Sequence, residues 1–91
     1  MRKEIELNLK GLDSEDDFHE RVLRSFDFPY YYGRNEDAFW DCLSEIFDET
    51  KVVVRGLSSL NYKMEKIVSC YIKMLQDYEH ERSGRFHVIL E

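Results

Sequence analysis

Lys51-Val52-Val53-Val54-Arg55 is the stretch that decides the fold. Three consecutive valines stand between two basic residues, and Gly56 follows the run. β-Branched side chains favour strands, and an unbroken apolar run is typical of a strand that other elements cover. We therefore expect residues 51–55 to form the central strand of a sheet that is covered on at least one face.

The chain before this strand predicts a first strand and two helices. Residues 4–9 alternate polar and apolar side chains, as a strand does. Ser14 and Asp17 resemble a capping box, which predicts a helix that ends before Pro29. A second helix is expected to begin after Asn35, a favourable N-cap residue. The apolar faces of these two helices hold Phe18, Val22, Leu23 and Phe26, and then Phe39, Cys42, Leu43 and Ile46.

The chain after the central strand predicts a helical turn, a long helix and a last strand. Ser58 or Ser59 opens the turn, and residues 86–90 (FHVIL) form the strand. The apolar face of the long helix holds Met64, Ile67, Val68, Tyr71, Leu75 and Tyr78. Strands separated by helices favour a parallel sheet. The sequence therefore predicts an α/β fold, a three-stranded parallel sheet with helices packed against it, in a single domain over residues 1–91.

Composition and charge restrict the class of partner. The 91 residues include 13 Lys and Arg against 19 Asp and Glu, a net charge of −6. A direct nucleic-acid binder usually has a basic excess, so we expect a basic protein partner instead. No secretory signal or membrane span is apparent, which favours a cytoplasmic location without membrane contact. Cys42 and Cys70 have apolar neighbours and are expected to be buried, reduced thiols.

Residues 29–43 (PYYYGRNEDAFWDCL) hold the candidate binding site. Three consecutive tyrosines cannot all face one core, so at least one ring is expected in solvent, while Tyr30 or Tyr32 closes the end of the core. Gly33 is expected to take a positive φ that tyrosine disfavours. Trp40 flanks the apolar stripe, where it can pack inward or contact a partner.

Carboxylates recur along the second helix at a spacing that predicts one acidic face: Asp37, Asp41, Glu45 and Asp48. Asp37 lies in the first turn, where the helix dipole favours negative charge. Asp41 lies beyond that turn, between two like charges, and each such pair destabilises a helix by about 0.2–0.5 kcal/mol. Asp41 is therefore a candidate for contact with a partner, whereas Glu45 and Asp48 also fit a solvated helix face.

Residues 29–43 closely resemble the corresponding segment of the barstar family of intracellular ribonuclease inhibitors. The matching residues are Pro29, Tyr31, Tyr32, Gly33, Asn35, Asp37, Ala38, Trp40, Asp41, Cys42 and Leu43. The resemblance implies a three-stranded parallel sheet with helices packed against it. It also implies that the protein blocks the active-site cleft of a microbial ribonuclease as a monomer that forms a 1:1 complex.

The resemblance further implies a role for individual residues. Asp41 would supply the central carboxylate, which stands in for a substrate phosphate. Tyr31 and Asp37 would lie beside it, and Gly33 and Asn35 would aim them. The candidate partner-binding residues are Tyr31, Gly33, Asn35, Asp37, Trp40, Asp41 and Glu45.

Two departures from the barstar pattern concern the contact surface. Glu45 and Ile46 stand where barstar has Gly and Trp. The family also uses a glutamate on the long helix, and a count back from the last strand without gaps places Tyr78 there. Asp77 or Glu79 would take that place only if the register of the helix differs.

Three alternatives remain open at this stage. The protein could be an immunity protein against a ribonuclease toxin delivered between cells, or a barstar-like scaffold for a non-ribonuclease partner. As a metal-dependent enzyme, it could use Asp37 and Asp41 to share a divalent cation. His19, His80 and His87 fall in three different elements and no glycine-rich phosphate loop is present, so we expect no enzyme, no metal and no cofactor.

Overall fold

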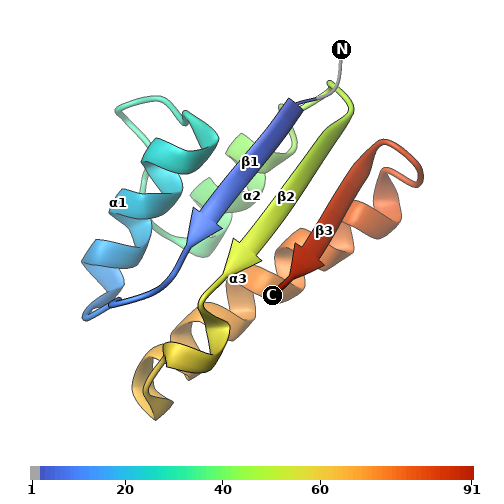
Figure 1. Ribbon diagram of the computed structural model, residues 1–91. Coiled ribbons are helices and arrows are strands. Elements are labelled where there is room, and N and C mark those ends of the chain that lie inside the picture. The colour runs from blue at the N-terminus through green and yellow to red at the C-terminus, as the bar shows by residue number, and fades with distance from the viewer. Residues whose placement is uncertain (1–2) are drawn as a thin grey trace.

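The computed structural model describes residues 3–91 and forms a three-stranded sheet (Figure 1). Strands β1 (Lys3–Asn8), β2 (Thr50–Arg55) and β3 (Phe86–Leu90) are parallel and lie in the order β1-β2-β3. Val52 lies opposite Ile5 on one side and Val88 on the other. The predicted parallel sheet and its central strand are therefore confirmed.

The helices α1 (Glu15–Phe26), α2 (Glu36–Leu43) and α3 (Tyr62–Glu81) lie on one face of the sheet (Figure 1). A short 3₁₀ turn, η1 (Leu57–Ser59), follows β2 where the serines predicted a helical turn. α1 packs against β1, α3 packs against β3, and α2 packs against α3. The largest buried side chains between these layers are Phe18, Phe39, Phe86, Leu7, Leu9, Leu43, Met64 and Leu75.

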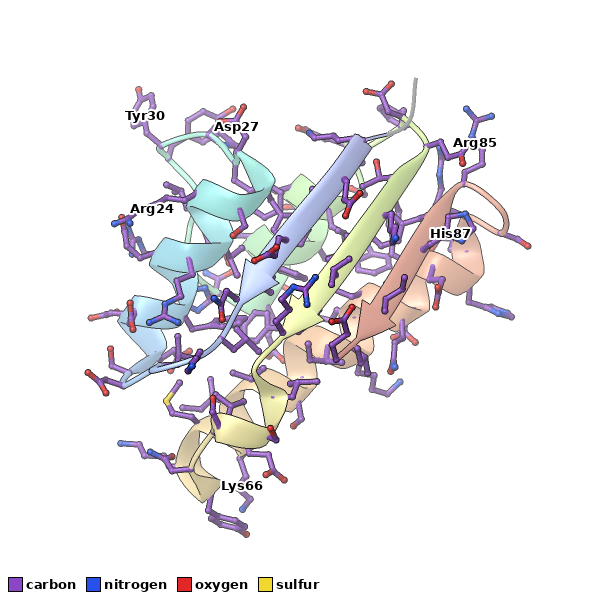
Figure 2. The ribbon with its side chains drawn as sticks, in the orientation of Figure 1. Arg24, Asp27, Tyr30, Lys66, Arg85 and His87 are labelled. Carbon is purple, nitrogen blue, oxygen red and sulfur yellow. The ribbon has the colours of Figure 1, made fainter. Side chains whose placement is uncertain are left out.

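The opposite face of the sheet carries mostly polar side chains. Arg55 forms ion pairs with Glu6, at 3.5 Å, and with Glu91. Figure 2 shows His87 on β3, where its side chain is exposed. Val53 is buried on this face because Glu6 and Ile89 flank it on the neighbouring strands. A single layer of helices is therefore enough to enclose the core.

The predicted N-cap residues begin both short helices. The Ser14 hydroxyl accepts a hydrogen bond from the Asp17 backbone N–H at 3.1 Å. The Asn35 side-chain oxygen accepts one from the Ala38 N–H at 2.8 Å. Each cap satisfies a backbone donor that has no partner within the helix. α1 ends at Phe26, before the proline, as predicted.

The expectation that both cysteines are buried is wrong for Cys70. Cys42 is half-buried and Cys70 is exposed, and both thiols are free. α3 turns Tyr71 and Ile72 into the core, so the preceding position faces solvent. Burial raises the pKa of the Cys42 thiol, and the carboxylates of Glu45 and Asp41 add to the effect.

Candidate functional site

The three consecutive tyrosines of the α1–α2 loop separate into two kinds. Tyr30 and Tyr31 are exposed, at 92% and 74%, and their rings meet edge to face at 5.5 Å. Figure 2 shows Tyr30 pointing away from the body of the protein. Tyr32 is buried and packs on Phe28, so it closes the end of the core. The expectation of one exposed and one buried tyrosine is confirmed, and Tyr31 is free to meet a partner.

The expected positive φ at Gly33 is wrong, because the adjacent Arg34 takes the left-handed conformation, with φ of 54°. Gly33 instead allows a close approach. A Cβ atom at this position would lie 3.1 Å from the Cβ of Ala38 in the first turns of α2. Arg34 holds its unfavourable conformation while its guanidinium pairs with Glu20 on α1 at 2.7 Å. Lack of a side chain, not backbone freedom, therefore explains the glycine.

The start of α2 is held by Asn35. Its side-chain oxygen caps the helix at Ala38, and its side-chain nitrogen donates to the Gly33 carbonyl at 3.3 Å. The first turn then presents Glu36 and Asp37, where the helix dipole favours negative charge. Asn35 and Gly33 therefore set the direction of the helix. Both are exposed, and Asn35 lines a separate hollow with Glu36.

Asp37 and Asp41 lie on one open hollow of about 590 Å³ between α2 and α3. The hollow is lined by Glu36, Asp37, Trp40, Asp41, Met74 and Asp77. Four of these six residues are acidic and the other two are apolar. The prediction from sequence named Asp37, Trp40 and Asp41. It missed Glu36, in the first turn of α2 itself, and Met74, which joins the surface only because α3 packs beside α2.

Trp40 is half-buried and joins the two helices. Its ring meets the ring of Tyr78 on α3 edge to face, with the centroids 5.8 Å apart. The same tryptophan lines the hollow, so one side of the residue packs on the protein and another remains accessible. Both sequence interpretations of Trp40, as a packing residue and as an accessible one, are therefore compatible with its position.

The expected acidic helix face is wrong beyond Asp41, since α2 ends at Leu43. Glu45 and Asp48 lie in the segment that follows and line a different hollow, of about 290 Å³, near Lys3. The predicted apolar stripe is shortened for the same reason: Phe39 and Leu43 are buried, whereas Cys42 and Ile46 are only half-buried.

The sequence left open which of three neighbouring residues on α3, the long helix, takes the place of the family's glutamate. Tyr78 is buried, and its hydroxyl donates to the Ile46 carbonyl. Glu79 points to the sheet, where its carboxylate accepts a hydrogen bond from the Val88 N–H at 2.8 Å. Asp77 lines the hollow with Asp37 and Asp41, and it also pairs with exposed Lys73 at 3.6 Å.

The chemistry of this hollow is that of an acceptor surface for cationic side chains. Carboxylates accept charge-assisted hydrogen bonds from guanidinium and ammonium groups, which are among the strongest in proteins. Among the described residues, no lysine or arginine lines the hollow, although exposed Lys73 pairs with Asp77. Within residues 3–91, no three His, Cys, Asp or Glu side chains are placed to hold one metal ion together. In the same range, none of the helices has the length and hydrophobicity to cross a membrane.

Comparison with known proteins places the whole chain in one group. The family model described as Barstar (barnase inhibitor) matches residues 2–91. A Bacillus subtilis (strain 168) protein named "Putative ribonuclease inhibitor YrdF" is 29% identical over 92 residues, which cover all of both chains. The sheet order, the helical layer and the full-length family match agree with one another, and the chain belongs to the barstar family.

Proposed function

We propose that this protein inhibits a microbial ribonuclease by placing its acidic hollow over the active-site cleft of the enzyme. The observation that carries the proposal is the position of Asp41. It lies in the last turn of a short helix, is exposed, and shares a mainly acidic hollow with Asp37 and Asp77. The family assignment and the name of the B. subtilis relative support the same class of function.

The mechanism follows from the charge of a ribonuclease cleft, which binds phosphate through cationic groups. Carboxylates at the spacing of Asp37 and Asp41 replace phosphate oxygens and accept hydrogen bonds from those groups. Tyr31 adds an exposed aromatic ring that can pack against the rim of the cleft. The enzyme is then inhibited by occupation of its substrate site, and the inhibitor itself performs no chemistry.

Asp77 is proposed as the acid that α3 contributes. It lines the same hollow as Asp41. Tyr78 is buried, and the Glu79 carboxylate accepts a hydrogen bond from β3. Its exposed pair with Lys73 is weak, because such pairs are screened by solvent. A cationic group of the enzyme can therefore replace Lys73 at little cost.

Glu45 is the site prediction that the geometry supports least. It lies after the end of α2 and lines the smaller hollow with Asp48. A partner that covers both hollows would contact it, and a partner that covers only the acidic hollow would not. The effect of Glu45→Ala on binding therefore tells whether the partner covers both hollows or only the acidic one.

The test uses two probes, barnase and any secreted or toxin-borne ribonuclease encoded beside the gene of this protein. RNA cleavage is expected to stop at an equimolar ratio with one of them, and Asp41→Ala is expected to weaken that complex by about 2 kcal/mol or more. Asp13→Ala removes the same charge from an exposed position that lines neither hollow and serves as the matched control. Equal inhibition by wild type and Asp41→Ala would contradict the proposed site, and no inhibition of either enzyme would favour a non-ribonuclease partner.

A further inference from the structure

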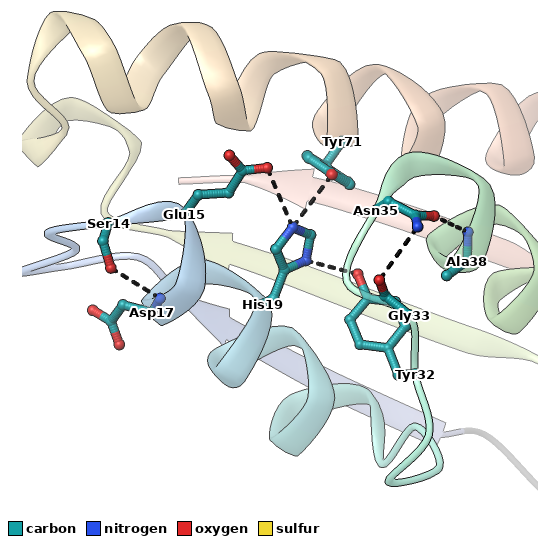
Figure 3. Close-up of polar contacts among 9 residues, drawn as sticks. All are labelled: Ser14, Glu15, Asp17, His19, Tyr32, Gly33, Asn35, Ala38 and Tyr71. Atoms are coloured by element: carbon teal, nitrogen blue, oxygen red, sulfur yellow. Dashed lines mark hydrogen bonds and ion pairs between the residues drawn. The ribbon is translucent and has the colours of Figure 1, made fainter.

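His19 is a buried histidine that contacts the candidate binding loop. It lies on α1, is 1% exposed, and its Nδ1 atom is 2.8 Å from the hydroxyl of Tyr32 (Figure 3). The Tyr71 hydroxyl on α3 lies 3.3 Å from Nε2, and the Glu15 carboxylate lies 3.6 Å from the same atom. The imidazole therefore links α1, α3 and the loop.

The partners of the ring define which nitrogen carries the proton. A carboxylate only accepts hydrogen bonds, so the N–H belongs on Nε2, which faces Glu15. Nδ1 is then the acceptor, and the Tyr32 hydroxyl donates to it. Burial raises the pKa of Tyr32, which keeps that hydroxyl protonated as a donor. In this arrangement the imidazole is neutral, and the loop donates to α1 through the Tyr32 hydroxyl.

The next residue of α1 holds the other side of Gly33. The Glu20 carboxylate accepts a hydrogen bond from the Arg34 guanidinium at 2.7 Å. Arg34 has a φ of 54°, a conformation that side-chain-bearing residues rarely adopt without support. The loop is thus attached to α1 at two positions that flank Gly33, one buried and neutral, the other exposed and charged.

We propose that His19 and Glu20 are positioning residues for the α1–α2 loop. By holding Tyr32 and Arg34, they fix the backbone around Gly33 before any partner arrives. The exposed Tyr31 ring and the capping residue Asn35 are then presented in one conformation. A preset loop loses less conformational entropy on binding than a mobile one.

This arrangement makes the loop sensitive to pH. A second proton on His19 turns Nδ1 into a donor, so the Tyr32 hydroxyl must rotate and accept the hydrogen bond, which reverses its direction. Burial lowers the pKa of His19, an effect that Arg34 on the loop adds to and that Glu15 and Asp16 on α1 oppose. From α3, the group that faces the ring is the neutral hydroxyl of Tyr71.

The test uses the free protein and backbone amide NMR, as the pH is lowered from about 8 to about 5 across the range where histidine titrates. The amide signals of Tyr31, Gly33 and Asn35 are expected to change along the same curve as the His19 imidazole. Tyr32→Phe removes only the hydroxyl and should abolish this response in the loop. His87→Gln removes an exposed histidine and should leave it unchanged.

Hydrogen exchange gives a second readout for the charged attachment. Glu20→Gln is expected to speed exchange of the capped Ala38 amide about fivefold, the effect of losing roughly one hydrogen bond. Asp13→Asn, an exposed acid just before α1, is the matched control. The amides of β2 report whether a variant is folded.

The role of His19 would be overturned if the amide signals of the loop did not follow the titration of His19. It would also be overturned if these signals changed equally in wild type and Tyr32→Phe. Unchanged exchange at Ala38 in Glu20→Gln would overturn that of Glu20. The consequence for binding rests on the proposed function, but this experiment contains no ribonuclease. Failure to find an inhibited enzyme and failure of the positioning residues are therefore separate results.

Discussion

The hydroxyl of Tyr78 donates a hydrogen bond to the backbone carbonyl of Ile46 at 2.8 Å. The same tyrosine supports the ring of Trp40 edge to face. One residue of α3 therefore holds both α2 and the segment that follows it. Arg82, one turn later, donates to the Phe47 carbonyl at 3.0 Å and extends the attachment. These contacts join α2 and the segment after it to α3, the two sides of the acidic hollow.

Tyr78→Phe is expected to lower the free energy of unfolding by about 1 kcal/mol, because the Ile46 carbonyl loses its side-chain donor while the ring still packs. Urea denaturation followed by circular dichroism measures the change. Tyr62→Phe removes a hydroxyl from a ring that is 74% exposed and is expected to have little effect. Equal midpoints for the two variants would show that the Ile46 contact does not contribute to stability.

Asp77→Asn is expected to weaken ribonuclease binding by about 1–3 kcal/mol while leaving stability nearly unchanged. The carboxylate lines the acidic hollow, and its ion pair with Lys73 is exposed to solvent and therefore of small energetic value. Calorimetric titration with the inhibited ribonuclease provides the affinity. Glu81→Gln, an exposed charge on the same helix, is the control. An unchanged affinity in Asp77→Asn would remove α3 from the contact surface.

The features of this fold that depend on local sequence could be predicted from the sequence alone. Such features arise from interactions between residues that are close in the chain. Examples are the valine run of β2, the helix caps at Ser14 and Asn35, and the apolar spacing along α3. Asp37 and Asp41 could be placed on one helix face for the same reason. The position of β2 at the centre of the sheet followed from its apolar character on both sides.

Features that depend on contacts between elements could not be predicted. Tyr32 rather than Tyr30 is buried because His19 on α1 provides its hydrogen-bond partner. The left-handed residue is Arg34 because Glu20 pairs with it and Ala38 occupies the space beside Gly33. Asp77 joins the acidic hollow through the packing of α3 on α2, a relationship that the spacing of residues along either helix does not contain.

Association with the ribonuclease is expected to slow as salt is added. The protein has a net charge of −6 and concentrates carboxylates on one hollow, which should steer a basic enzyme toward it. The association rate constant should fall by at least about tenfold between low and high ionic strength, while dissociation changes less. Stopped-flow mixing measures both rates. Asp37→Asn should reduce the salt dependence more than Asp48→Asn, and identical slopes would argue against local steering.

The free energy of unfolding is expected to fall when the pH decreases through about 6.5. Burial lowers the pKa of His19 in the folded protein from its ordinary value of 6.5, so the unfolded chain takes up this proton first. The loss of stability should begin near pH 6.5 and level off below the pKa of His19 in the folded protein. His19→Gln should flatten this part of the profile, whereas His87→Gln should not. Urea titrations over a pH series would contradict the assignment if wild type and His19→Gln gave parallel curves.

Gly33→Ala is expected to destabilise the start of α2, because the new methyl group would lie 3.1 Å from the Cβ of Ala38. Overpacking of this kind typically costs about 1–3 kcal/mol. If the Ala38 contact is the cause, Ala38→Gly should relieve it, so that the double variant is more stable than the sum of the two single effects predicts. Urea denaturation of the four proteins measures this coupling. Additive effects would mean that the contact with Ala38 is not the source of the cost.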